Sequence, residues 1–464
     1  MRGEINPPEQ CHLVHLSKVT RSHCSGNIQY ALTIARYCTS LKETPTLSSF
    51  IDNISKRQIE IRWNDGKCGN FPYVWLRDTS PDTQTYTFSS AMMARNLTMR
   101  DFNVEVVPQR IALEDDQLII DWPTGVVSKY SSEWLRLRNP CDDEMRHRRR
   151  QVYLKETQLW NAKEIASRLS RYEFNAVIND DHVLHDFLLS VCRDGIAFVS
   201  GGTPDAVARI GQRIGLIQRT HFGEIFEVTT KADASNMAYA SNKELPFHTD
   251  FPSLNDPPQV ISASDQSSTI CMVFQLQMLH MLQRADEGGL NLFVDGFHVA
   301  EQLRMNHRKY FDLLTRVKME YIEQGYDVHE GIDAKPHTFY YDMAAQHRVI
   351  RTDMDGNVIR IQFGNAMRSW FYECDVNEIQ EIYRAMKLFT DYCYLPENIL
   401  KIQMENGDIV LWANTRLLHT RTAYRSSADR PRRLSGCYFS WDIVKSRIRH
   451  LRDKLNHPLN QPCV

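Results

Sequence analysis

The chain has 464 residues and a formal net charge of -2, with 42% hydrophobic and 24% charged residues. This composition is typical of a globular protein with a large core and room for two or three domains. Because the charge is nearly balanced and no run of about twenty apolar residues is present, we expect a small-molecule ligand, with no nucleic-acid and no membrane partner.

The eleven cysteines are scattered and form no CxxC pair, which argues against a disulfide scaffold and favours a reducing compartment. Residues 1–49 are rich in basic, Ser and Thr residues, as mitochondrial transit peptides are, but Glu4, Glu9 and Glu43 argue against import. We expect residues 1–49 to be a poorly ordered leader and the protein to be cytoplasmic, with a mitochondrial location as the alternative.

A small β-rich domain is expected at residues 50–140. Ile59, Ile61 and Trp63 alternate with polar residues, and an Asn-Asp-Gly turn follows. Further strand-like runs lie at residues 73–76, 104–107, 111–113 and 118–122. The charged residues 141–154, with their HRRR run, are expected to be a solvated linker, and nucleic-acid binding is the alternative.

Helices and strands are expected to alternate through a second domain, residues 155–455, before a tail at 456–464. Asn161 can cap a helix together with Glu164. Helices are expected at residues 181–193, 207–214, 299–314 and 377–392, and strands at 195–199, 358–363, 409–412 and 438–441. The whole pattern predicts a mixed α+β fold, mainly β, with a barrel or jelly-roll core covered by helices.

One stretch, LPFHTDFP, suggests a metal site. His248 and Asp250 are separated by one residue, so in an extended segment both side chains point to the same face. His419, in NTRLLHTR, would complete a set of two histidines and one carboxylate. Such a set leaves part of an octahedral ion open, as non-haem Fe(II) oxygenases require. The triplet alone is weak evidence, because many histidines have only structural roles.

Several motifs surround this stretch in a fixed order: FHTDFP, Pro257-Pro258, LxxLH at 276–280, GGLNLFVDGF at 288–297, NTRLLHTR, and RRLSGCYFSWDIVKSR at 432–447. From about residue 52 to its end, the chain resembles the γ-butyrobetaine dioxygenase and trimethyllysine dioxygenase family. The WDxVxSRxR run is closer to the γ-butyrobetaine branch. The resemblance implies a double-stranded β-helix (jelly-roll) catalytic core with flanking helices, a small N-terminal β domain and a homodimer.

The same resemblance implies the reaction. An enzyme of this family uses Fe(II), with ascorbate as reductant, and couples oxidation of 2-oxoglutarate to succinate and CO2 with hydroxylation of a C–H bond. The expected substrate is γ-butyrobetaine and the product carnitine. The alternatives are trimethyllysine or another amine or amino acid as substrate, or a catalytically silent relative that only binds a ligand.

Site residues follow from the matching motif positions. The resemblance implies that His248, Asp250 and His419 bind iron and that Arg432 binds the distal carboxylate of 2-oxoglutarate through a bidentate guanidinium. The rivals of Arg432 are Arg421, Arg430 and Arg433.

The resemblance also implies an aromatic cage for a quaternary ammonium group, which aromatic faces hold best. The matching positions are Phe222, Phe226, Tyr239 and Tyr438, with Asn236 and Asn365 as polar substrate contacts. Phe222 and Phe226 replace the Tyr and Trp of the family pattern, so a weaker or differently tuned cage is expected. The alternative is that these residues are ordinary core aromatics.

The family's N-terminal domain binds zinc through three cysteines after a WLRD motif and one later histidine. Here WLRD is present at residues 75–78, but the cysteine positions hold Ser80, Asp82 and Thr85, and the histidine position lies near Val126. Thiolates make such sites tight, so we predict no zinc.

Residues 260–275, VISASDQSSTICMVFQ, are predicted to be an insertion. Deleting them restores PPQLQMLH, which matches the family pattern without a gap. Codons for Val260 begin with GT and Gln275 can be encoded by CAG, as at the two ends of an intron. One hypothesis is therefore that the segment is a translated intron. The alternative is a genuine surface loop, which the Ser-rich half would tolerate.

Overall fold

The computed structural model describes residues 45–88, 93–151, 153, 157–220, 223–229, 242–254, 275–330 and 335–455. Contacts divide the chain into two compact units, one ending at His147 and the other beginning at Arg148. The expected tail and most of the expected leader lie outside the described residues. The first strand begins at Leu47, so ordered structure starts slightly before the expected boundary at residue 50.

The first unit contains two three-stranded antiparallel sheets and a short strand pair. One sheet has β1 (Leu47–Asn53), β2 (Gln58–Trp63) and β3 (Cys68–Pro72), the other β6 (Arg110–Glu114), β7 (Gln117–Asp121) and β8 (Val127–Ser131), and the pair is β4 (Tyr86–Phe88) with β5 (Met93–Arg95). The unit also contains η1 (Ile54–Lys56), α2 (Tyr73–Asp78) and α3 (Ser132–Leu137). α4 (Asp143–Gln151) begins in it, within the expected linker. Ile59, Ile61 and Trp63 are buried together with Leu118 and Ile120, so the alternating residues build one core.

Two expected strands of this unit are wrong. Residues 73–76 form the start of α2, because Tyr73, Leu76 and Arg77 are buried at helical spacing and a short apolar run fits either period. Residues 104–107 form no strand in the structure, where Val104 and Val107 are exposed. Val106, between them, is buried in the core, so this segment contributes one side chain to the core without forming a strand.

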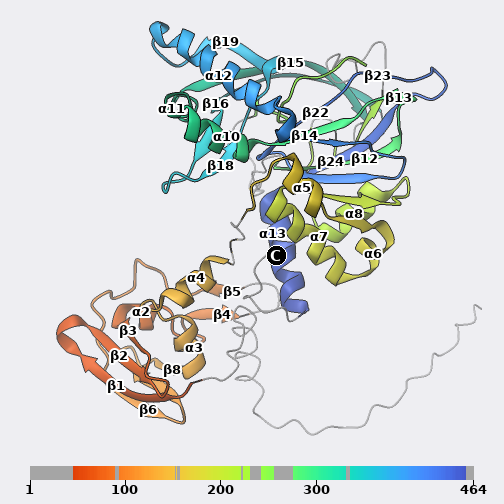
Figure 1. The fold of residues 1–464 in the computed structure, drawn as a ribbon. Helices are drawn as coiled ribbons and strands as arrows, with labels where there is room; N and C mark the ends of the chain where they lie inside the picture. Colours follow the sequence, from red (N-terminus) through yellow and green to blue (C-terminus); the bar gives the residue numbers. More distant parts are fainter. Residues whose placement is uncertain are drawn as a thin grey trace, which may run out of the picture. The chain divides into compact units, whose positions relative to one another are not determined.

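The second unit is built on a six-stranded sheet. Its order is β11 (Phe226–Thr229), β24 (Arg433–Phe439), β12 (Leu276–Gln283), β21 (Ile409–Ala413), β10 (Ile196–Ser200) and β9 (Arg171–Glu173). Helices α6 (Phe174–Asn179), α7 (Asp181–Asp194), α8 (Ala206–Ile214) and α13 (Trp441–Lys454) cover one face (Figure 1). Ala197 and Val199 contact these helices, whereas Ile196 and Phe198 face the other side.

On that other side lies a three-stranded sheet of β20 (Ile399–Ile402), β14 (Asn291–Asp295) and β22 (Leu417–Arg421). The two sheets share a core in which the rings of Phe293 and Trp412 are 5.4 Å apart. The mixed helix and strand content of the expected fold is confirmed, while the jelly-roll winding stays a prediction.

Beyond the smaller sheet lies a second layer of helices and strands. It contains α10 (Gly296–Asn306), α11 (Arg308–Arg316), α12 (Ile379–Cys393), β15 (Lys318–Glu330), β16 (Pro336–Arg348), β17 (Ile350–Thr352), β18 (Val358–Ile361) and β19 (Arg368–Tyr372). Short elements complete the unit: α5 (Ala162–Arg168), β13 (Glu287–Gly288), β23 (Tyr424–Arg425), η2 (Asn365–Met367), η3 (Val376–Glu378) and η4 (Pro396–Asn398). The expected cap of α5 is confirmed, because Asn161 and Glu164 bond each other's backbone N–H groups.

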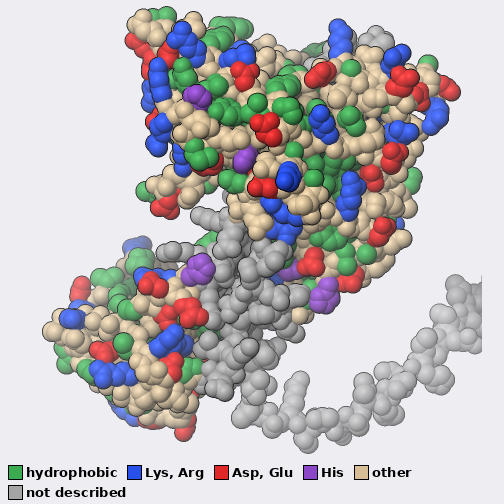
Figure 2. All heavy atoms as spheres, viewed as in Figure 1, with side chains coloured by type: hydrophobic (Ala, Val, Ile, Leu, Met, Phe, Trp, Pro, Cys, Tyr) green, Lys and Arg blue, Asp and Glu red, His purple; other side chains and the backbone are tan. Residues whose placement is uncertain are grey.

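No helix among the described residues is long and apolar enough to cross a membrane. Acidic and basic side chains are intermixed on the face of the second unit that Figure 2 shows, in keeping with the near-neutral charge. Of the suspected insertion, all residues except Gln275 lie outside the described part. The Gln275 amide donates to the Phe439 carbonyl (3.3 Å), and its side-chain oxygen accepts from the Trp441 amide (2.6 Å), so Gln275 leads directly into β12.

Candidate active site

The HTD stretch lies alongside β22. The backbones of His248 and His419 exchange two hydrogen bonds, with N···O distances of 3.1 and 2.9 Å. On its other side the stretch is tied to Phe363, because the Thr249 amide donates to its carbonyl (2.8 Å). Two segments distant in sequence therefore hold the two imidazole rings with their centroids 4.4 Å apart.

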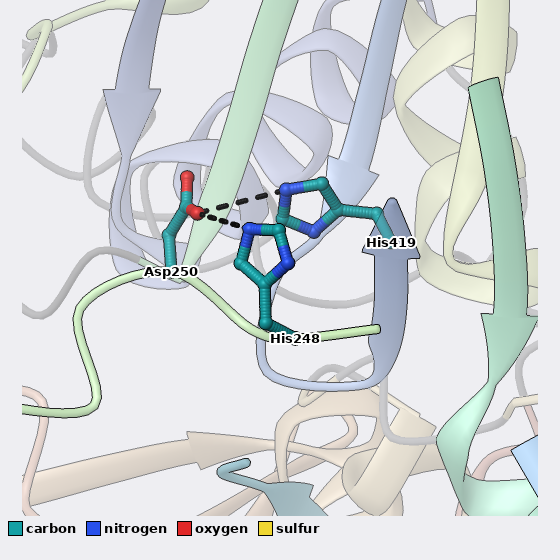
Figure 3. Close-up of side chains that lie close together, drawn as sticks. All are labelled: His248, Asp250 and His419. Atoms are coloured by element: carbon teal, nitrogen blue, oxygen red, sulfur yellow. Dashed lines mark ion pairs between the residues drawn. The ribbon is translucent and has the colours of Figure 1, made fainter. Parts of the chain in front are cut away.

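The carboxylate of Asp250 faces both rings (Figure 3). Its Oδ1 is 3.4 Å from Nε2 of His248 and 3.6 Å from Nε2 of His419. One donor atom from each of the three residues lies within 4.8 Å of the others, a spacing that can hold a metal ion. The structure thus brings together the three residues that the sequence singled out; their role as ligands stays a prediction.

Asp250 is held through its backbone and its side chain. The Asn414 side chain accepts from the Asp250 amide (2.8 Å) and donates to its carbonyl (3.1 Å). The Tyr438 hydroxyl donates to Asp250 Oδ2 at 2.7 Å. Burial raises the pKa of Asp250, but His419, His248 and this hydroxyl outweigh burial and hold the pKa at about 2. The carboxylate is therefore ionised at any physiological pH, as a metal ligand requires.

Both imidazoles present Nε2 toward the carboxylate. His248 Nδ1 lies 2.9 Å from the Pro246 carbonyl, so a proton on Nδ1 satisfies that carbonyl and leaves the Nε2 lone pair available. His419 packs on Trp412, with ring centroids 4.9 Å apart. Burial and the neighbouring His248 lower the pKa of His419 to about 3, so its ring is neutral. Neutral imidazoles and an ionised carboxylate are the forms that bind a divalent metal.

Two buried arginines lie close together, Arg421 at the end of β22 and Arg432 just before β24. Arg432 and Arg421 are 5% and 6% exposed, and their guanidinium carbons lie 5.3 and 4.6 Å from the ring centroid of Tyr424. Burial and the charge of Arg421 lower the pKa of Arg432 to about 10. Among the described residues, none hydrogen-bonds Arg432 Nε or forms an ion pair with this side chain. A buried cation without an acidic partner is a ready site for an anion.

Burial separates two of the three rival arginines from Arg432. Arg430 is exposed, and Arg433 is exposed and pairs with Glu227 at 3.2 Å. Arg421 shares the Arg432 cluster, but its Nη1 donates to the Lys243 carbonyl at 2.6 Å and so ties the segment before His248 to β22. Burial therefore favours Arg432 and Arg421 over the two exposed arginines.

Comparison with known proteins supports the resemblance seen in the sequence motifs. The family model described as "Taurine catabolism dioxygenase TauD, TfdA family" matches residues 264–438. Over 403 residues the chain is 30% identical to γ-butyrobetaine dioxygenase of Homo sapiens, covering 86% of this chain and 95% of that protein. The chain belongs to the family of γ-butyrobetaine and trimethyllysine dioxygenases. The resemblance inferred from the motifs is confirmed, and the protein is a 2-oxoglutarate-dependent dioxygenase.

The chain is also similar to a trimethyllysine dioxygenase. Mitochondrial trimethyllysine dioxygenase of Rattus norvegicus is 28% identical over 388 residues, covering 82% of each chain. Among solved structures, a taurine dioxygenase from Burkholderia xenovorans has a TM-score of 0.36 at 11% identity, covering 54% of this chain and 78% of that one.

Only part of the expected substrate cage of this dioxygenase can be placed. Phe222, Asn236 and Tyr239 lie outside the described residues. Phe226, on β11, stacks on Tyr438 with ring centroids 5.3 Å apart.

Asn365 is exposed, and its Oδ1 accepts from Arg368 at 3.3 Å. Its neighbours Gly364 and Ala366 line a cavity of about 60 Å³ together with His248, so η2, which begins at Asn365, adjoins the triad.

The zinc positions of the family are occupied by a hydrogen-bonded network. The hydroxyls of Ser80 and Ser128 are 2.5 Å apart, and Trp122 Nε1 donates to Ser128 at 2.7 Å. Asp82 accepts hydrogen bonds from the amide and the hydroxyl of Thr85. Val126 is buried in the apolar core. These groups satisfy one another; the zinc-free first unit stays a prediction.

Two residues of the site were not predicted from the sequence. Asn414 opens the NTRLLHTR motif, but nothing in the motif says that its side chain binds Asp250. Glu323, on β15, is 9% exposed and accepts a hydrogen bond at 2.8 Å from Ser253, which closely follows Asp250 in the chain. The sequence shows only a glutamate in an alternating, strand-like run. It does not show which face of that strand is buried, so Glu323 could not be singled out.

Proposed function

We propose that this dioxygenase hydroxylates γ-butyrobetaine to carnitine and that His248, Asp250 and His419 bind its Fe(II). The observation that carries the proposal is the cluster of three donor atoms within 4.8 Å, two from the imidazoles of His248 and His419 and one from the ionised carboxylate of Asp250. This donor set suits Fe(II), and three protein ligands would leave positions on the bound ion for a co-substrate and dioxygen.

The reaction balances with two organic substrates. One oxygen atom of dioxygen enters succinate as 2-oxoglutarate loses CO2, and the other enters a C–H bond of γ-butyrobetaine as a hydroxyl group. The iron, when bound, supplies the activation of dioxygen. The protein holds the three donor atoms close together, and the aromatic and aliphatic residues around His419 and His248 limit the access of water to the site.

Arg432 is proposed to bind the distal carboxylate of 2-oxoglutarate. Its guanidinium is buried, stays charged at physiological pH because its lowered pKa is still about 10, and has no acidic partner in the described part of the chain. An unpaired cation in a buried position is energetically costly. A carboxylate that binds there offsets this cost, so binding of 2-oxoglutarate is favourable. Tyr424 packs against the guanidinium and limits its movement.

Phe226 and Tyr438 are proposed to form part of the surface for the trimethylammonium group, together with Phe222 and Tyr239. In support, Phe226 stacks on Tyr438, whose hydroxyl reaches Asp250, so an aromatic surface adjoins the triad. Asn236 and Asn365 are the proposed polar contacts. Trimethyllysine presents the same cationic group and is the second candidate substrate, in keeping with the 28% identity to the rat trimethyllysine enzyme.

Succinate formation tests the proposal. Protein loaded with Fe(II) and 2-oxoglutarate is expected to form succinate and carnitine when γ-butyrobetaine is added, and His248→Ala is expected to abolish both. Faster turnover with trimethyllysine than with γ-butyrobetaine would show that trimethyllysine is the preferred substrate. If neither amine stimulates 2-oxoglutarate consumption, the protein is a silent relative, and if turnover survives in His248→Ala, the metal assignment is wrong.

Three further parts of the proposal have simple tests. Ascorbate is the proposed reductant, and its omission is expected to shorten the period of linear turnover. The protein is proposed to be a homodimer, which light scattering of the full chain measures directly. A cytoplasmic location is proposed, with a mitochondrial one as the alternative, and fractionation of cells that express the full chain separates the two.

A further inference from the structure

Tyr438 has a contact that a wall of a substrate pocket does not require. It lies on β24 and is 3% exposed, and its hydroxyl donates to Oδ2 of Asp250 at 2.7 Å. The other carboxylate oxygen, Oδ1, is the one that faces Nε2 of His248 and His419. The two oxygens of Asp250 thus have different partners: Oδ2 contacts the phenol and Oδ1 faces the histidines.

The ring of Tyr438 is held in place by its neighbours. Phe226 stacks on one side, at 5.3 Å between centroids with planes 26° apart, and Phe251 meets the ring edge-on at 5.4 Å. A ring packed in this way has little freedom to turn, so its hydroxyl has a defined direction. The hydroxyl can therefore orient a neighbouring group rather than follow it.

The backbone next to Asp250 is also constrained. Phe251 has a φ of 55°, which is unusual for a large side chain and persists only where surrounding contacts impose it. The Asn414 side chain holds the Asp250 amide and carbonyl. With the main chain held by Asn414, the rotation of the carboxylate is the remaining freedom, and the Tyr438 hydroxyl restricts it.

We propose that Tyr438 is a positioning residue for the metal ligand Asp250, holding Oδ2 so that Oδ1 alone is presented to the metal. This inference rests on the proposed iron site. It assigns the hydroxyl and the ring of Tyr438 to different tasks, because a cationic substrate needs only an aromatic face. A carboxylate free to turn would offer either oxygen or both, and a second metal-bound oxygen would occupy a position that 2-oxoglutarate or dioxygen requires.

Tyr438→Phe separates the two tasks, because it keeps the ring and removes only the hydroxyl. In full-length protein, Mn(II) binding followed by electron paramagnetic resonance is expected to weaken by about 10–100-fold, the usual effect of losing a partner of a metal ligand. The matched control is Tyr172→Phe, at β9 on the opposite edge of the same sheet, where a half-buried tyrosine bonds Ser190 at 2.8 Å. The control is expected to bind Mn(II) as the wild-type protein does.

A second readout addresses the cage. At saturating Mn(II), binding of γ-butyrobetaine to Tyr438→Phe is expected to change by less than about threefold, because the aromatic face remains. Unchanged Mn(II) affinity together with weakened γ-butyrobetaine binding would overturn the inference and leave Tyr438 a cage residue only. If the wild-type protein itself binds no Mn(II), the proposed iron site fails, which is a different outcome.

A labelled protein covers the case in which Tyr438→Phe does not fold. 3-Fluorotyrosine placed at position 438 keeps both ring and hydroxyl, and Zn(II) serves as a diamagnetic probe of the site. Zn(II) is expected to shift the fluorine resonance, because metal binding withdraws charge from the carboxylate that accepts the phenol proton. A resonance that Zn(II) leaves unmoved, at concentrations that saturate the site, would contradict the inference.

Discussion

His248 and His419 exchange both of their backbone hydrogen bonds, at 3.1 and 2.9 Å. The two imidazoles therefore depend on the register of the segment 242–254 against β22. Thr420 and Arg421 hold the same register, since their side chains donate to the carbonyls of Leu245 and Lys243. A change in this register would separate the ligands without altering any of them.

The first prediction concerns metal binding. His419→Ala and Asp250→Asn are each expected to abolish stabilisation by Mn(II), because each removes one of three donors. In the wild-type protein, Mn(II) at one hundred times its Kd is expected to add about 2.7 kcal/mol to the free energy of unfolding. Denaturant unfolding with and without Mn(II) measures the difference. The exposed His307→Ala is the control; equal stabilisation of His419→Ala would show that the metal binds elsewhere.

The second prediction concerns the co-substrate. Arg432→Met is expected to weaken 2-oxoglutarate binding by about 2 kcal/mol or more, roughly 30-fold in Kd, because a buried charge partner is lost. The same variant is expected to unfold at a higher temperature without 2-oxoglutarate, since a buried cation next to Arg421 is removed. Calorimetry measures both quantities. Arg433→Met, at an exposed position, is expected to change neither, and a larger effect there would reassign the anion site.

The third prediction concerns pH and Glu323. Burial raises the pKa of this glutamate, and the charge of Asp250 adds to the effect, while the Ser253 hydroxyl opposes it. The folded state then keeps a proton that the unfolded state has lost above about pH 4.5. Stability is therefore lost as pH rises through the folded pKa.

Glu323→Gln keeps an acceptor for Ser253 and carries no charge. In metal-free protein it is expected to be more stable than wild type at pH 8, with the difference shrinking toward pH 4.5. Denaturant unfolding at several pH values measures this trend. A glutamine variant that is less stable at pH 8 would mean that the carboxylate has a cationic partner.

The fourth prediction concerns the first unit. Ser128→Ala is expected to cost about 1–3 kcal/mol, because Trp122 Nε1 and the Ser80 hydroxyl lose their buried partner. Hydrogen exchange of residues 45–147 in the full chain measures the effect, with the exposed Thr98→Ala as control. A chelator is expected to leave the same exchange rates unchanged. Bound zinc in stoichiometric amount, with faster exchange after chelation, would contradict a zinc-free unit.

The fifth prediction concerns the suspected insertion. Deletion of residues 260–275 places Gln259 directly before Leu276, where Gln275 now accepts a hydrogen bond from Trp441. The deletion variant is therefore expected to fold, with a melting temperature at or above that of the full chain and Mn(II) affinity unchanged. Sequencing of the spliced transcript shows whether the segment is a translated intron or a genuine surface loop. Continuous coding of these residues in every mature message would exclude a translated intron.

Local patterns in the sequence determined several features correctly. The alternation at Ile59, Ile61 and Trp63 is the alternation of a strand with one buried face. The cap at Asn161 depends only on residues three apart. The ordered motifs identified the family, because each motif records a set of local constraints that chance does not repeat in the same order.

The tertiary structure decided what local patterns leave open. The run at residues 73–76 is helical because tertiary burial selected the helical period over the strand period. Arg432 is separated from Arg430 and Arg433 only by burial, which neighbouring residues in sequence do not share. The two histidines and the hydroxyl of Tyr438 meet at Asp250 because long-range strand pairing and packing bring them together, and sequence spacing carries no record of that pairing.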